Sequence, residues 1–99
     1  MILLDIILED EKKAEEISAF LIEHKYALQT HIDTNTILTS NGQKKTIRLF
    51  FITKALLYST IESEVKKTFF SEEMIIYASP LSHINEEFGQ LLRNGIKAI

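Results

Sequence analysis

The chain lacks cysteine altogether and contains only three glycines and one proline. Without cysteine it can form no disulfide, no cysteine-ligated zinc site and no thiolate nucleophile. The glycines, Gly42, Gly89 and Gly95, are too far apart for a phosphate-binding loop or a dinucleotide-binding fingerprint, because both need clustered glycines. These absences exclude P-loop, dinucleotide-dependent and thiol-dependent enzymes.

An excess of basic residues is also missing. The 99 residues include 11 Lys and Arg against 14 Asp and Glu, which gives a formal net charge of −3. A general nucleic-acid-binding surface needs the opposite balance, because phosphate contacts come mainly from Lys and Arg. We therefore expect no nucleic-acid partner.

No apolar run is long enough to cross a membrane. Residues 1–8 are apolar apart from Asp5, with no basic region before them and no small-residue cleavage site after them. This segment therefore predicts a buried strand and not a signal peptide. Together with the lack of cysteine, it favours a cytoplasmic protein without a membrane partner.

What the sequence does contain is one domain, residues 1–99, with alternating strand and helix patterns. Apolar residues recur at helical spacing in three segments and almost without interruption in the inner strands. The expected elements are a strand at 2–8, a helix from about 9 to 25, strands at 30–39 and 47–52, a helix at 57–69, a strand at 74–78 ended by Ser79 and Pro80, and a helix begun by the N-cap Asn85 and closed by Gly95. This βαββαβα order, with right-handed crossovers, predicts an α+β, ferredoxin-like antiparallel sheet plus a C-terminal helix.

The segment from Tyr26 to Lys54 predicts a long β-hairpin closed at Asn41-Gly42. Asn-Gly suits a type I′ turn, in which both central residues have positive φ. Such a turn pairs Ser40 with Gln43, Thr36 with Ile47 and Ile32 with Phe51. One face then carries Leu28, Ile32, Thr34, Thr36, Leu49 and Phe51, and the other carries Gln29, His31, Asp33, Asn35, Arg48, Phe50 and Ile52.

The first and third strands are expected in the middle of the sheet, because both of their faces are largely apolar. Helices cover only one face of such a sheet, so another surface must cover the second face. The simplest cover is a second copy of the chain. A hairpin this long also extends beyond what one small domain can cover, which again predicts contact with another chain.

Three segments resemble the CutA divalent-cation tolerance proteins, which are related to the PII signalling fold. Residues 14–27 resemble the family's "AEKIARALVEEKLAA" helix and its exit, and residues 49–54 resemble its "LLIIKT" strand. The segment from Ile75 to Arg93 follows its "IIALPIEAGNPDYLDWIR" ending. The resemblance implies a PII/CutA-like ferredoxin fold, a homotrimer joined through hairpins and strand edges, and a non-enzymatic role in copper or zinc tolerance or in signalling.

The resemblance also bears on three candidate metal ligands. Gln29 occupies the position of a cysteine usual in the family, and Glu72 matches the Glu of its "HPYE" segment. His31 lies on the same predicted strand face as Gln29, opposite Ile52. In a trimer, three copies of His31 could meet on the axis as a zinc-ligand set. The alternative is a strand histidine satisfied by local hydrogen bonds. No catalytic residue and no other cofactor is predicted.

Other functions remain open at the level of sequence. One is a PII-like regulatory module that binds a small effector between subunits, although the tight turn at Asn41-Gly42 differs from the long mobile loop of PII proteins. Another is a small enzyme of the dimeric α+β barrel type that uses His31 or His83 as its acid–base group. Acylphosphatase activity is excluded, because the first loop, residues 9–11, is acidic and would repel phosphate.

Overall fold

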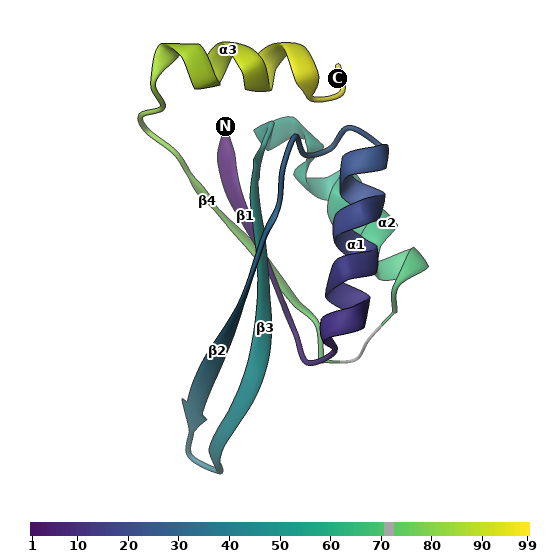
Figure 1. Cartoon of the computed structure of the whole chain (residues 1–99), viewed down its shortest axis with the longest axis vertical. Helices are drawn as coiled ribbons and strands as arrows, with labels where there is room; N and C mark the ends of the chain where they lie inside the picture. The colour runs from purple at the N-terminus through teal and green to yellow at the C-terminus, as the bar shows by residue number, and fades with distance from the viewer. Residues whose placement is uncertain (71–72) are drawn as a thin grey trace.

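The computed structural model describes residues 1–70 and 73–99. Its elements follow one another along the chain as expected from the sequence (Figure 1). They are β1 (Ile2–Leu8), α1 (Glu11–Glu23), β2 (His31–Thr39), β3 (Gly42–Thr53), the 3₁₀ turn η1 (Ala55–Leu57), α2 (Tyr58–Thr68), β4 (Ile75–Pro80) and α3 (Glu86–Gly95). Within this part of the chain no helix combines the length and the apolar character that crossing a membrane requires.

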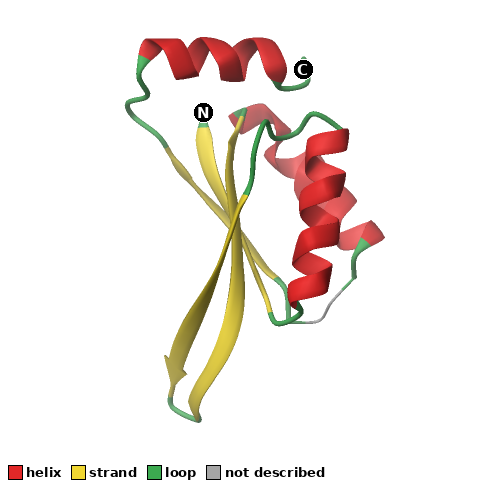
Figure 2. Cartoon of the chain, in the orientation of Figure 1, coloured by secondary structure: helices red, strands yellow, loops and turns green. Residues whose placement is uncertain are grey.

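The four strands form one antiparallel sheet in the order β2-β3-β1-β4 (Figure 2). This confirms the predicted α+β ferredoxin-like fold with β1 and β3 inside. The exposed, Thr-rich β2 lies at one edge, also as predicted. β1 pairs with β3 only from Ile47 to Thr53, so the far half of the β2–β3 hairpin is two-stranded and extends beyond the rest of the sheet (Figure 1).

The core lies between the sheet and the pair α1 and α2, which cover the same face (Figure 1). Alternate side chains of β1 and β3 point into it, and Leu4, Ile6, Leu49 and Phe51 are fully buried. α1 contributes Ala14, Ile17 and Leu21, and α2 contributes Ile61 and Val65, which recur every three to four residues. Phe69 packs at the edge of this core, whereas Phe70 is exposed.

The hairpin register predicted from the sequence is wrong by two residues. Thr39 pairs with Gly42, so Thr36 faces Lys45 and Ile32 faces Leu49. The reason lies in the turn, where Gly42 alone has a positive φ, 115°. The Thr39 hydroxyl accepts a hydrogen bond from the Asn41 N–H at 3.1 Å and donates one to the Gly42 carbonyl at 3.2 Å, which makes Ser40 and Asn41 the central residues. Because the shift is even, each side chain keeps its predicted face.

β4 is longer than predicted, whereas α3 begins at the predicted N-cap but without a side-chain capping bond. β4 does not end at Ala78 but continues to Pro80, which pairs with Ile2. Proline has no backbone N–H to donate. It is tolerated there because β4 is an edge strand, which is paired with a neighbour on one side only. Asn85 takes the N-cap position of α3, but its side chain donates to Glu87 at 3.2 Å and makes no capping hydrogen bond.

The end of α1 is held by a Schellman motif. His24 is the C-cap, the Lys25 N–H donates to the Ile22 carbonyl, and the Tyr26 N–H donates to the Leu21 carbonyl at 2.9 Å. Lys25 takes a positive φ of 60°, a position that usually belongs to glycine. A local conformational cost is therefore built into this turn.

Replacing Lys25 with glycine is expected to raise the free energy of unfolding by about 0.5–1 kcal/mol, because glycine adopts the left-handed conformation without the Cβ clash. Urea denaturation of the two proteins measures the difference. Lys25→Ala, which removes the same side chain but keeps a Cβ, is the matched control and should give no such gain. An unchanged or lower stability of Lys25→Gly would show that the turn carries no strain.

α3 lies across one end of the sheet and not on the face covered by α1 and α2 (Figure 1). Leu92 and Ile96 are buried, and Lys54 Nζ donates to the Ile96 and Lys97 carbonyls at 3.1 and 3.2 Å. The Lys97 N–H donates to the Lys25 carbonyl at 2.7 Å. A Cβ at Gly95 would collide with the Leu28 side chain, so glycine permits this close approach.

Candidate functional site

The sheet face opposite α1 and α2, here called the open face, carries a buried charge at its centre. The side chain of Asp5 is only 6% exposed, and it accepts a hydrogen bond from Arg48 Nε at 2.7 Å. A second carboxylate, that of Asp33, lies 3.8 Å from Arg48 Nη1. The hydrogen bond from Arg48 to Asp5 is the main cause that raises the pKa of Arg48. The ion pair joins β1 to β3 in a place where apolar side chains are the rule.

Arg48 also belongs to a stack of three side chains along the hairpin. The Arg48 guanidinium lies 4.0 Å from the centre of the Phe50 ring, and the His31 ring lies 5.0 Å from the same ring at an interplanar angle of 17°. His31 pairs with Phe50 across the strands, not with Ile52 as predicted, because of the register shift. Arg48 is thus fixed by a carboxylate on one side and an aromatic face on the other.

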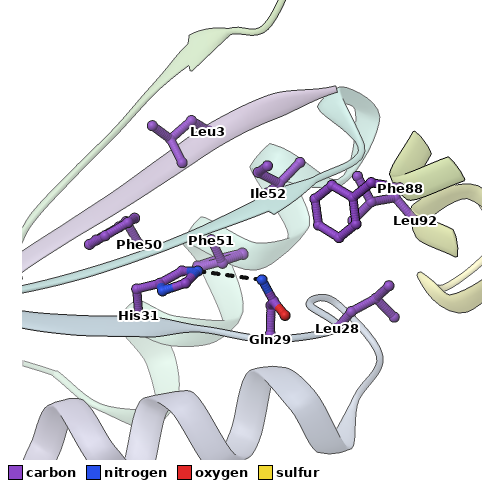
Figure 3. A pocket seen from close by; sticks show the side chains of 9 residues that line it. All are labelled: Leu3, Leu28, Gln29, His31, Phe50, Phe51, Ile52, Phe88 and Leu92. Carbon is purple, nitrogen blue, oxygen red and sulfur yellow. Dashed lines mark hydrogen bonds between the residues drawn. The ribbon is translucent and has the colours of Figure 1, made fainter. Parts of the chain in front are cut away.

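A cavity of about 100 Å³ lies between α3 and the open face (Figure 3). We call it the α3 cavity, and it is lined by Leu3, Leu28, Gln29, His31, Phe50, Phe51, Ile52, Phe88 and Leu92. Phe88 and Leu92 enter from α3, while His31 and Phe50 lie at the opposite end (Figure 3). Seven of these nine side chains are apolar, so the cavity suits a ligand that is mainly apolar.

Two of the three predicted metal ligands meet at this cavity. The Gln29 amide nitrogen lies 3.5 Å from His31 Nε2, so the amide donates and the imidazole nitrogen accepts (Figure 3). Gln29 lies in the loop before β2, because the strand begins at His31. The third predicted ligand, Glu72, lies outside the described residues. Within those residues no group of three or more His, Asp or Glu side chains is placed to hold a metal ion.

The remaining histidines have local roles. His24 lies at the C-terminal end of α1, where its Nδ1 donates a hydrogen bond to the Phe20 carbonyl at 2.9 Å. His83 is exposed in the loop before α3, and its Nδ1 lies 3.0 Å from the Ser82 hydroxyl. Both histidines thus make hydrogen bonds with residues close to them in the chain.

The Asp5–Arg48 pair was not predicted from the sequence, although two signals for it were present. Asp5 is the single charge in an apolar inner strand, and a buried carboxylate needs a partner. Arg48 is the single cation in the apolar stretch of β3, two residues from Phe50, which is the cross-strand partner of Asp5. The α3 contribution to the cavity was missed too, because Phe88 and Leu92 mark an apolar helix face without showing which surface it meets.

A second hollow lies at the other end of the open face, near Arg48, Ile75 and Tyr77. Thr46 also lines it, and this buried hydroxyl has no hydrogen-bond partner within the described residues. Ile75 and Tyr77 are 52% and 50% exposed. This end of the face is therefore apolar and open.

Comparison with known proteins identifies solved structures of the same fold. No family model matches the chain, and no curated protein does either. CutA1 from Pyrococcus horikoshii superimposes with a TM-score of 0.88 at 15% sequence identity, covering 99% of this chain and 100% of that one. The divalent cation tolerance protein Cut A1 from Thermus thermophilus gives 0.80 at 20%, covering 98% and 100%.

A third similar structure is the periplasmic divalent cation tolerance protein CutA from Archaeoglobus fulgidus, with a TM-score of 0.81 at 19% identity, covering 98% of this chain and 100% of that one. All three matches extend over nearly the full length of both chains. At such identities they establish the fold, and the chain has the fold of the CutA proteins. The resemblance seen in the sequence is thereby confirmed for the three-dimensional structure.

Proposed function

We propose that this chain is a divergent CutA-like protein that acts as a non-enzymatic homotrimer in divalent cation tolerance. The observation that carries the proposal is the structural match over nearly the full length of both chains to proteins whose names state that role. The same proposal makes residues 1–99 a single CutA-like domain. It assigns the protein to the cytoplasm, which fractionation of expressing cells would test.

The open face and the extended hairpin support assembly. Ile75 and Tyr77 expose apolar surface on that face, and Leu38 near the hairpin tip is 74% exposed. The edge strand β2 offers backbone hydrogen-bonding groups to a neighbour. Size-exclusion chromatography with light scattering tests this directly. A mass of three subunits is expected, and a stable monomer at micromolar concentration would overturn the assembly.

Metal binding rests on His31 with Gln29 beside it. One histidine per subunit gives three in a trimer, and three histidines form a recognised zinc-ligand set. Calorimetric titration with copper and zinc tests the claim, with His31→Ala as the control that should lose the heat of binding. No heat at millimolar metal would remove this part of the proposal.

Replacing Gln29 with cysteine is expected to tighten zinc and copper binding by about tenfold or more, because a thiolate is a far stronger ligand than an amide and His31 already lies beside it. Competition titrations against a chelator measure the change. The matched control is Gln29→Ser, because serine, like cysteine, is smaller than glutamine but cannot form a thiolate. Equal affinities for the Cys and Ser variants would show that position 29 does not reach the metal.

The α3 cavity supports a second candidate, a PII-like module that binds a small effector. Its lining gives an apolar enclosure with two polar groups. The two-residue turn at Ser40-Asn41 weighs against a PII-type signalling loop. A thermal-shift screen with nucleotides and amino acids discriminates between the two functions. A melting temperature raised by several degrees with any of these compounds would favour effector binding over cation tolerance.

A further inference from the structure

We propose that the α3 cavity binds a small aromatic molecule that carries one neutral hydrogen-bonding group, the chemistry of phenol. The proposal concerns a site inside one subunit and requires neither a trimer nor a metal ion. It therefore stands or falls separately from cation tolerance. Size, wall chemistry and the placement of two polar side chains support it.

The size of the cavity selects a single ring. Its volume is about 100 Å³, and it is partly open to solvent. An engineered apolar cavity of about 150 Å³ in another protein stays dry and binds benzene. A six-membered ring, with its substituent at the open side, is thus the largest rigid group that fits here. Lipid chains and nucleotides are too large.

The walls favour an aromatic ring over an aliphatic one. Two of the lining side chains, Phe50 and Phe88, carry phenyl groups on different elements, and Phe51, whose ring belongs to the core, also borders the cavity. Aromatic pairs gain from edge-to-face and offset contacts beyond the burial of area. Leu3 and Ile52 complete the wall from the inner strands. A flat ring can contact several of these groups at once.

The polar groups define the substituent. Gln29 and His31 are the two polar side chains among the nine that line the cavity, and they lie side by side (Figure 3). With its nitrogen directed at His31, the Gln29 amide still has a carbonyl oxygen that can accept a hydrogen bond from a hydroxyl. Two charged side chains lie beside the lining residue Phe50, and these, Asp5 and Arg48, are paired with each other. A neutral donor such as a phenolic hydroxyl therefore fits better than a carboxylate or an ammonium group.

The test is a titration of the full-length ¹⁵N-labelled protein with phenol and, separately, with benzene, followed by amide chemical shifts in the presence of a chelator. Saturable shifts at millimolar phenol are expected for residues 28–31, 50–52 and 88–92. Phenol should bind about two- to tenfold tighter than benzene, the ratio that one net hydrogen bond provides. The chelator removes any contribution from metal bound at His31.

Two variants and one control complete the test. Gln29→Leu, in an exposed loop, should bring phenol binding down to the level of benzene binding while benzene binding is retained. Leu3→Phe should fill the cavity and abolish both. Leu56→Ala, at an exposed position on η1 that does not line the cavity, should change neither.

Several outcomes would overturn the proposal. No saturable shift at millimolar phenol would show that the cavity is not a site, including the case in which a side chain from a second copy fills it. Equal binding of phenol and benzene by the unmodified protein would remove the assigned chemistry. If Leu3→Phe does not fold, phenol and benzene binding by Gln29→Leu and by the unmodified protein still test the proposal.

Discussion

Truncation of Phe51 to alanine is expected to lower the free energy of unfolding by about 3–5 kcal/mol, the usual cost of removing a buried phenyl ring. Phe51 is among the largest fully buried side chains and pairs with Leu4 across the two inner strands. A domain of 99 residues has a total stability of only about 5–15 kcal/mol. The variant should therefore lie close to the limit of folding, as measured by urea denaturation.

A conservative change at the same position provides the control. Phe51→Leu keeps most of the buried volume and should cost less than about 1.5 kcal/mol. If Phe51→Ala costs no more than Phe51→Leu, the core does not depend on this ring. Phe51 also lines the α3 cavity, so its truncation enlarges that space. Benzene bound in the enlarged space should then restore part of the lost stability, because it binds the folded state and not the unfolded one.

Replacing Arg48 with methionine is expected to cost about 2–4 kcal/mol, because it leaves the Asp5 carboxylate buried without its partner. The lower limit allows for the partial exposure of Arg48, whose side chain is 30% accessible. Asp5→Leu should cost less, since Arg48 retains Asp33 as a nearby carboxylate and contact with water. Denaturation of the two single variants at neutral pH measures this asymmetry.

The double variant Asp5→Leu/Arg48→Met separates the pair from its parts. A buried ion pair replaced by apolar groups of similar volume is commonly neutral or stabilising. Most of the stability lost by Arg48→Met should therefore return in the double variant. Strictly additive losses would show that the two side chains do not act together, despite the 2.7 Å contact.

Element order and core were predictable because the signals for them are local. Apart from Asp5, Ile2–Leu8 is apolar on both faces, and so is the 47–52 segment apart from Arg48. Those two features place β1 and β3 inside the sheet before any contact is known. Distant residues do not alter such patterns.

The hairpin register and the site depend on interactions that no local pattern shows. The Thr39 hydroxyl decides which residues form the turn, and Asn41-Gly42 alone suggests a different pair. The α3 cavity requires Phe88 to meet strand residues that lie far earlier in the chain. That meeting depends on the loop before α3 and on the close approach of Gly95 to Leu28.

The attachment of α3 has a consequence for local opening and hydrogen exchange. α3 is held by Leu92, by Ile96 and by hydrogen bonds from Lys54 and Lys97, whereas β1 is paired along both edges. The amides of Phe88 and Leu92 should therefore exchange through a sub-global opening that leaves the sheet intact, and faster than those of Leu4 and Ile6. This opening gives a small molecule a route into the space beneath the helix, and a bound molecule should slow exchange in α3 without slowing it in β1.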